Sequence, residues 1–199
     1  MKPASKKNVS RIRIIGGYWR SRLLKVADQP GLRPSTDRVR ETLFNWLGQD
    51  LDGLKCLDMF AGTGALGFEA LSRGAQEVVF IENNPVVHQM LQTNLKDLGE
   101  LPEGSHAQIV KADALIWLKK QQLMQFDIVF IDPPFADLQT FEKSLIAITQ
   151  SLNLSKSTAI YVECASEVSN DVLLSHLPGW QIYRQMMAGA VKATLLRLE

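Results

Sequence analysis

The sequence is poor in residues that build covalent or metal-bound scaffolds. Its 199 residues include only two cysteines, Cys56 and Cys164, and three histidines. Neither cysteine has a Cys or His partner at the spacing of a zinc site, so we expect neither a disulfide framework nor a bound metal. Both cysteines fall in apolar strand patterns, where a small buried hydrophobic side chain is the expected role.

Long apolar runs are also missing from this sequence. No stretch approaches the ~18–20 apolar residues that cross a bilayer, and residues 1–8 lead into no apolar segment of a signal peptide. Apolar residues make up 46% and charged residues 22% of the chain, which is typical of a globular protein with a sizeable core. We therefore expect a cytoplasmic protein with no membrane partner.

The net charge of +1 hides an uneven distribution of charge along the chain. Residues 1–40 carry eleven Lys or Arg and two Asp, whereas residues 41–199 carry eleven basic and nineteen acidic side chains. A basic segment joined to an acidic body indicates a polyanionic partner held at one end. A solvated tail is the alternative, but this segment also has strand and helix patterning that a tail would lack.

From Lys55 onward, apolar and β-branched strand patterns alternate with helical ones. Strands are expected at 55–60, 77–82, 107–111, 126–132, 158–163, 180–187 and 191–198. Helices are expected at 64–73, 85–98, 114–120, 138–152 and 168–177. This order predicts an α/β, Rossmann-like fold with a seven-stranded, mostly parallel sheet and helices on both faces. The last two strands, joined at Gly189, form a C-terminal antiparallel hairpin.

The N-terminal part reads as a small basic extension. Residues 1–34 are expected to form a basic arm followed by short strands around Gly16 and Gly17. Residues 35–199 are expected to form the main domain, which opens with a packing helix over 36–47. That helix would be capped by Ser35 or Thr36 and would carry one apolar stripe.

A glycine-rich loop follows the first strand of the main domain. Gly62, Gly64 and Gly67 satisfy the G-x-G-x-x-G pattern between a strand and a helix, which alone would indicate a dinucleotide site. Asp58 argues against that site, because a carboxylate four residues before Gly62 would repel a pyrophosphate. It suits a cationic ligand instead, and S-adenosylmethionine carries both an ammonium and a sulfonium.

Acidic residues also follow the next two strands. Glu82 can accept hydrogen bonds from both ribose hydroxyls, and Asp113 can accept one from the adenine amino group, with the Ala114 N–H near a ring nitrogen. For any one of these acids the alternative is a surface or helix-capping role. The predicted cofactor-binding residues are Asp58, Phe60, Ala61, Gly62, Gly64, Glu82, Asn83, Asp113 and Ala114.

A second motif follows the fourth strand, where the chain reads Asp132-Pro133-Pro134-Phe135. The prolines fix the backbone and remove two N–H donors, so the turn presents the Asp132 carboxylate and the Pro133 carbonyl as acceptors. Two acceptors suit an –NH2 group, whose nitrogen lone pair they free for attack on a methyl group. Phe135 can stack on the attached ring, a contact worth ~1–3 kcal/mol per base. These four residues are the predicted catalytic residues; a proline-rich loop with a core Phe is the alternative.

Three blocks of the sequence resemble known methyltransferases. The Asp58-x-x-x-Gly62-x-Gly64 pattern is similar to the cofactor motif of class I methyltransferases. Residues 132–135 resemble the (D/N)PP(Y/F) motif of enzymes that methylate amines of nucleic acid bases or glutamine. Residues 13–20 and 32–47 resemble the RsmD-type bacterial methyltransferases, and this likeness extends from Arg11 to Leu198. Thr63 and Ser35 depart from the common residues, but both keep a hydroxyl.

The resemblance implies a methyltransferase domain over 35–199 that methylates N2 of one guanine in 16S ribosomal RNA. Its substrate would be the assembled or partly assembled 30S subunit, and we expect the enzyme to be a monomer. Arginines of the N-terminal part would bind RNA phosphates: Arg11, Arg13, Arg20, Arg22, Arg33, Arg38 and Arg40. Arg38 or Arg40 could instead pair with Asp37 or Glu41.

Several other functions fit the same residues. The amine could belong to adenine N6, cytosine N4 or a protein glutamine, since residues 132–135 suit any of them. The basic N-terminal segment favours nucleic acid over protein. A dinucleotide-dependent oxidoreductase is disfavoured by Asp58, and a non-catalytic RNA-binding or assembly factor by the two intact motifs. Only the family resemblance points to guanine N2.

Overall fold

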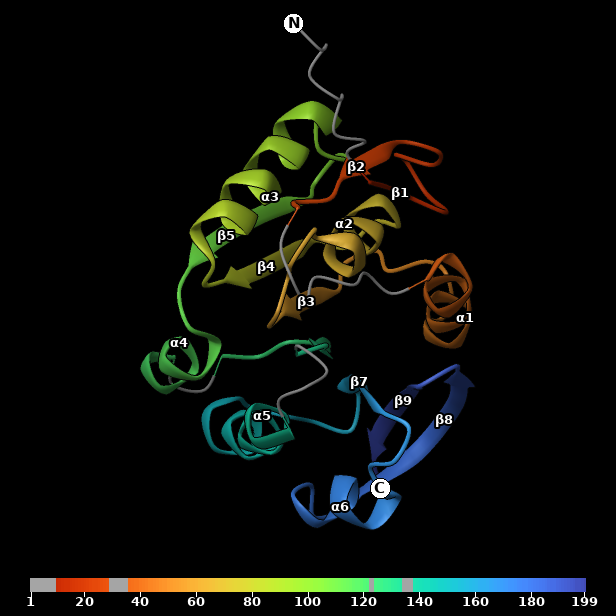
Figure 1. The fold of residues 1–199 in the computed structure, drawn as a ribbon, viewed down its shortest axis with the longest axis vertical. Coiled ribbons are helices and arrows are strands. Elements are labelled where there is room, and N and C mark those ends of the chain that lie inside the picture. The colour runs from red at the N-terminus through yellow and green to blue at the C-terminus, as the bar shows by residue number, and fades with distance from the viewer. Residues whose placement is uncertain (1–9, 29–35, 122–123, 134–137) are drawn as a thin grey trace, which may run out of the picture.

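A computed structural model of the chain has a seven-stranded sheet between two layers of helices (Figure 1). The structure describes residues 10–28, 36–121, 124–133 and 138–199. The strands of this sheet are β3 (Lys55–Asp58), β4 (Glu77–Glu82), β5 (His106–Lys111), β6 (Ile128–Ile131), β7 (Ala159–Ala165), β8 (Trp180–Ala188) and β9 (Val191–Leu198).

The strand order is β5-β4-β3-β6-β7-β9-β8. The first five strands in this order run parallel, and β9 is antiparallel to both β7 and β8. The predicted Rossmann-like sheet with a C-terminal antiparallel hairpin is therefore confirmed. The chain forms β3, β4 and β5 in order from the middle of the sheet to one edge. It then returns to the middle to form β6 on the other side of β3, so the strand order reverses between β3 and β6. Open α/β sheets bind their ligands beside the carboxyl ends of strands at such a reversal.

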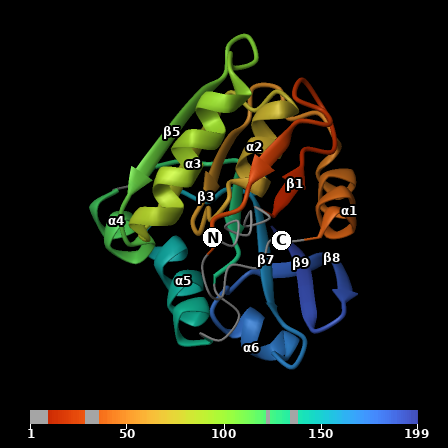
Figure 2. The same cartoon turned by 45° about the horizontal axis from the view of Figure 1, so that its top comes forward.

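Six helices cover the two faces of the sheet within the described residues. They are α1 (Asp37–Leu47), α2 (Ala65–Ser72), α3 (Pro85–Leu98), α4 (Ala114–Lys120), α5 (Leu138–Ser151) and α6 (Asn170–Ser175). The first three share a core on one face, and the last three share a core on the other. Figure 2 shows α2 and α3 on the side opposite α5 and α6. None of these helices is long and apolar enough to cross a membrane.

Side-chain caps define where several helices begin. Thr36 accepts a hydrogen bond from Val39 N at the start of α1, as predicted, and Asn84 accepts from Val86 N at the start of α3. Such caps satisfy backbone N–H groups that lack a partner within the helix. The predicted bounds of β4, α3, α4 and β9 match the structure residue for residue.

The N-terminal residues form a small sheet that packs on the main core. Strands β1 (Arg11–Arg13) and β2 (Leu23–Lys25) pair antiparallel. Ile12, Trp19 and Leu24 are buried in the same core as α1, α2 and α3. Residues 11–26 are thus packed against the main domain, while residues 1–9 and the predicted boundary at 34 lie outside the described residues.

Candidate active site

The glycine-rich loop is held to the carboxyl end of β4 by Glu82. One carboxylate oxygen of Glu82 accepts from Gly62 N at 3.0 Å, and the other accepts from Asn84 N at 2.7 Å. Ala61 N donates to Ile81 O at 2.9 Å. The loop after β3 and the end of β4 therefore form one hydrogen-bonded unit. Each carboxylate oxygen keeps a second lone pair that a ligand hydroxyl could use.

Glycine is required in this loop for two reasons. Gly62 has φ 53° and Gly64 has φ 81°, in the left-handed region that other residues rarely adopt. A Cβ at Gly64 would also lie 2.4 Å from the Phe68 ring, and one at Gly67 would lie 2.2 Å from the Phe80 ring. The glycines thus let the loop turn and let α2 approach the sheet closely.

Asp58 lies beneath this loop as the last residue of β3. Its side chain is 2% exposed, and Oδ2 accepts from Gly67 N at 3.2 Å. Burial raises the pKa of Asp58 to about 7, and the charge of Glu82 adds to this, while N–H groups of Gly67 and Phe60 oppose it. A nearby cation would favour the ionised carboxylate, so this environment fits the ammonium group that the sequence predicted.

Except for Phe60, the remaining predicted cofactor residues follow β4 or β5. Asp113 caps α4, with Oδ1 accepting from Ile116 N at 3.0 Å, so the capping role that we considered is present. Its exposed side chain has acceptor positions beyond this one hydrogen bond. Ala114 is buried behind it, and Asn83 is exposed after β4. Phe60, in the glycine-rich loop, is half-buried.

The predicted amine-binding turn begins directly after β6. Asp132 is half-buried and Pro133 is buried, whereas Pro134 and Phe135 lie outside the described residues. The register pairs Asp58 with Phe130, two residues before Asp132. The glycine-rich loop and the amine-binding turn therefore start from adjacent strand ends, on the two sides of the reversal in strand order.

One acidic residue next to this turn was not among the predicted site residues. Glu163 lies near the end of β7, is 2% exposed, and accepts from the Tyr161 hydroxyl at 2.7 Å. Burial, together with the charges of Glu163 and Asp132, raises the pKa of Tyr161 well above its usual value. The feature of the sequence that indicates Glu163 is an acidic side chain within the otherwise apolar strand 159–165.

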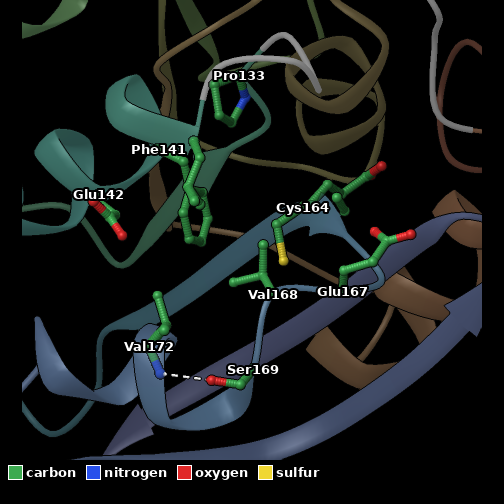
Figure 3. Close-up of a pocket in the computed structure, with 11 residues that line it drawn as sticks. Pro133, Phe141, Glu142, Cys164, Glu167, Val168, Ser169 and Val172 are labelled. Carbon is green, nitrogen blue, oxygen red and sulfur yellow. Dashed lines mark hydrogen bonds between the residues drawn. The ribbon is translucent and has the colours of Figure 1, made fainter.

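A cavity of about 380 Å³ opens next to the turn. Figure 3 shows Pro133 and Phe141 on one side of it and Cys164, Val168 and Val172 on the other. Its acidic lining residues are Glu142, Glu163 and Glu167. No Lys or Arg is found among the lining residues that the structure describes. The cavity therefore combines apolar walls with hydrogen-bond acceptors.

Most of the predicted RNA-binding arginines reach the surface. Arg11, Arg20, Arg22 and Arg38 are exposed. Arg22 donates to Asp97 O at 2.7 Å, and its charge, after that of Lys25, helps to lower the pKa of the Asp97 carboxyl group. The Arg13 side chain is 61% exposed and lies 3.5 Å from Asp37. Arg33 lies outside the described residues.

The prediction that Arg40 faces RNA is wrong. Its side chain is 0% exposed. Nη2 donates to Asp37 Oδ1 at 2.7 Å and to Arg13 O at 2.8 Å, and Nη1 lies 3.6 Å from Glu69. The N-terminal strands and α2 enclose this guanidinium, so it is part of the internal packing. The pairing with Asp37 was the alternative that we considered.

Comparison with known proteins assigns the chain to a family. The model of the family described as conserved hypothetical protein 95 matches residues 12–197. The ribosomal RNA small subunit methyltransferase D of Escherichia coli K12 is 43% identical over 200 residues, which cover 100% of this chain and 96% of that protein. The protein of the same name from Haemophilus influenzae is 40% identical and covers 92% of each chain. The chain belongs to the RsmD family of methyltransferases.

A solved structure agrees with membership of the RsmD family. The yhhF protein of Escherichia coli superimposes with a TM-score of 0.80 at 41% identity, covering 96% of this chain and 99% of that one. The cofactor of this RsmD-family enzyme is S-adenosylmethionine, and the residues present fit it. Gly62 and Gly64 provide the left-handed backbone of the loop, and Asp58 provides a buried carboxyl group that a bound cation would keep ionised.

Proposed function

We propose that this RsmD-family enzyme methylates the exocyclic N2 amine of a specific guanine in 16S ribosomal RNA. The substrate is the assembled or partly assembled small subunit in the cytoplasm, and the enzyme acts as a monomer. The names of the E. coli and H. influenzae relatives support small-subunit ribosomal RNA as the substrate. The observation that carries the proposal is the position of the Asp132–Pro133 turn, one strand away from the glycine-rich loop.

The chain's own residues prepare the amine. S-Adenosylmethionine, when bound, supplies an activated methyl group. The Asp132 carboxylate and the Pro133 carbonyl accept hydrogen bonds from the two amine N–H groups, which localises the nitrogen lone pair that would otherwise be delocalised into the ring. Asp132 then holds the proton that the amine loses. Phe135 stacks on the base. Holding the amine in a reactive orientation can itself lower the barrier by ~7–11 kcal/mol in favourable cases.

The cofactor is held at the carboxyl ends of β3, β4 and β5. Asp58 faces the ammonium group, and Glu82 binds the ribose hydroxyls while still fixing Gly62. Asp113 and the Ala114 N–H bind the adenine. Backbone groups of Phe60, Ala61, Gly62 and Gly64 line the approach, and Asn83 borders the ribose.

The RNA backbone is bound by the exposed arginines of the N-terminal part. Arg11, Arg13, Arg20, Arg22 and Arg38, together with Arg33, provide the positive charge of this region. Contacts between these residues and phosphates would release counterions, so binding should weaken as salt increases. The acidic body of the protein repels RNA elsewhere, which helps to orient the complex.

A variant of Asp132 tests the proposed role of the turn. Asp132→Asn keeps the shape but removes the negative charge and the site that takes the proton. We expect methyl transfer to small subunits to fall by ~10²–10⁴-fold, with unchanged affinity for S-adenosylhomocysteine measured by calorimetry. Asp127→Asn is the matched control, since Asp127 flanks the other end of β6, where it accepts from Lys55 N at 2.9 Å. Turnover of Asp132→Asn at the wild-type rate would remove Asp132 from the reaction.

A further inference from the structure

A polar side chain interrupts the buried face of α3. The buried residues of this helix are Val87, Leu91, Asn94 and Leu98, at the spacing of an apolar stripe that packs on a core. Asn94 is the polar member of the stripe and is 2% exposed. A buried amide must be hydrogen-bonded, because an unpaired polar group loses its hydration without compensation. The partners of Asn94 therefore indicate what the residue does.

The Asn94 amide connects β2 with the glycine-rich loop. Oδ1 accepts from Lys25 N at 2.8 Å, and Nδ2 donates to Lys25 O at 2.9 Å. Nδ2 also donates to Thr63 O at 3.2 Å. An amide nitrogen has two N–H groups, so one binds β2 and the other binds the loop. Strand β2 lies beside α3 (Figure 1), and the buried face of α3 joins this strand to the loop through one side chain.

The Thr63 end of this connection belongs to the cofactor-binding loop. Thr63 is 4% exposed and lies between Gly62 and Gly64, which have φ 53° and 81°. Gly64 N donates to Ala61 O at 2.7 Å, so the peptide group that joins Thr63 to Gly64 is hydrogen-bonded at both its carbonyl and its N–H. The hydrogen bond from Asn94 therefore helps to fix the loop conformation that the cofactor contacts.

The Lys25 end belongs to the surface that carries the N-terminal arginines. Lys25 lies opposite Arg11 in the register of β1 and β2. Its Nζ lies 2.7 Å from the Asp97 carboxylate of α3, and Arg22 donates to Asp97 O at 2.7 Å. Arg11 and Arg22 are exposed and are among the arginines proposed to bind RNA. Phosphates bound there would restrain β2 against α3, where Asn94 holds the strand.

We propose that Asn94 is a positioning residue that couples RNA binding at the N-terminal strands to cofactor binding at the glycine-rich loop. The inference rests on the proposed function, because it requires RNA at the N-terminal arginines. The amide is planar, so its two bonds to Lys25 determine the direction of the N–H that reaches Thr63. A displacement of β2 from α3 would break the bond to Thr63 and leave a buried carbonyl unpaired.

Coupling of this kind acts in both directions. RNA that holds β2 in place stabilises the loop conformation that binds the cofactor, and a bound cofactor stabilises the position of β2 by the same factor. The enzyme that carries both ligands is then favoured over the enzyme that carries one. Methyl transfer requires both ligands at once, so Asn94 contributes to the reaction without touching either of them.

The test measures the affinity for S-adenosylhomocysteine by calorimetry, with and without a saturating short RNA duplex. A duplex offers phosphates to the arginines while its bases stay paired, which excludes direct contact between a free base and the cofactor. We expect wild type to bind S-adenosylhomocysteine at least ~5-fold more tightly when the duplex is present. Asn94→Ala should bring this ratio close to one. A purely structural role would weaken the binding of each ligand and leave the ratio unchanged.

Thr158→Val is the matched control. Thr158 is 0% exposed, and its hydroxyl donates to Phe126 O at 3.2 Å and accepts from Ser155 N at 3.1 Å. These hydrogen bonds lie at the amino ends of β6 and β7, at the edge of the sheet opposite the glycine-rich loop. Thr158→Val should therefore keep the wild-type ratio. A ratio of one in wild type, or equal ratios for Asn94→Ala and wild type, would overturn the inference.

If Asn94→Ala does not fold, the wild-type protein provides the test. We expect the NMR signals of the Asn94 side-chain amide to shift when S-adenosylhomocysteine alone is added and also when the duplex alone is added. Signals that respond to only one of the two ligands would overturn the inference. A duplex that does not bind to the wild-type protein would overturn the proposed RNA-binding surface, and the inference with it, before S-adenosylhomocysteine is added.

Discussion

The guanidinium of Arg40 lies 3.6 Å from the carboxylate of Glu69, and both side chains are fully buried. The same carboxylate accepts from Ile15 N and Gly16 N, each at 2.8 Å, and lies 2.9 Å from Arg73 Nη2. One buried acid of α2 therefore holds α1 and the N-terminal strands in place. Residues 11–25, which form these strands and their connection, include four of the arginines proposed to bind RNA, so Glu69 helps to fix where those arginines lie relative to the site.

Glu69→Gln is expected to destabilise the protein. The substitution removes the negative charge that compensates two buried guanidinium groups, and breaking a buried pair by removing one partner costs about 3–5 kcal/mol. The free energy of unfolding in urea measures this loss. Glu77→Gln is the control, because the Lys55–Glu77 pair is partly exposed and should contribute only ~0–1 kcal/mol. Equal losses for the two variants would contradict the role of Glu69.

Gly67→Ala is expected to disturb both stability and cofactor binding. The new Cβ would lie 2.2 Å from the Phe80 ring, so α2 must move away from the sheet at the glycine-rich loop. Overpacking of this kind costs about 1–3 kcal/mol. The double variant Gly67→Ala with Phe80→Leu removes the obstructing ring and should recover part of the affinity for S-adenosylhomocysteine. A single variant with native stability and affinity would show that close packing at Gly67 is unimportant.

The contribution of Asp58 to stability is expected to fall as pH rises. Its pKa is raised from the ordinary value of 3.8 to about 7 in the folded protein, so the folded state binds this proton more tightly than the unfolded state does. The stabilisation is fully present below about pH 4 and is lost as pH rises through about 7. Without cofactor, the unfolding free energy of the wild type should fall relative to that of Asp58→Asn as pH rises over this range. A difference that does not change with pH would contradict the raised pKa.

Removing charge from the N-terminal surface should weaken RNA binding. We expect the triple variant Arg11→Gln, Arg20→Gln and Arg22→Gln to bind 16S RNA less tightly. The slope of log affinity against log salt concentration should also be less steep. The expected change is about 0.9 for each lost phosphate contact, the value for duplex nucleic acid. Filter binding at several salt concentrations measures both quantities. Arg184→Gln serves as the control, because Arg184 is an exposed arginine of β8 that stacks on Tyr183. A triple variant with wild-type affinity and slope would place the RNA-binding surface elsewhere.

The fold could be predicted where local signals determine it. The exact bounds of α3 follow from the cap at Asn84, Pro85 in the first turn and a glycine after Leu98. The acids at the ends of β3 and β4 were predictable because ligands bind at the carboxyl ends of parallel strands. Their additional hydrogen bonds to Gly62 and Gly67 were not predicted, since these depend on how the loop closes.

Arg40 and Glu163 could not be placed from sequence, because long-range packing decides their environments. Arg40 lies on a short amphipathic helix, and its burial depends on Glu69 in α2 and on the N-terminal strands. Glu163 hydrogen-bonds locally to Tyr161, but its position next to Asp132 depends on the register between β6 and β7. No spacing pattern within either segment encodes these contacts.

Nucleoside analysis of the methylated product tests the central claim most directly. Radiolabelled methyl groups would be transferred from S-adenosylmethionine to purified 30S subunits, with naked 16S RNA and DNA as parallel substrates. We predict that the label appears in the RNA of the 30S subunit as N2-methylguanosine at a single position. Label on adenine, on cytosine or on protein glutamine, with none on guanine N2, would contradict this account.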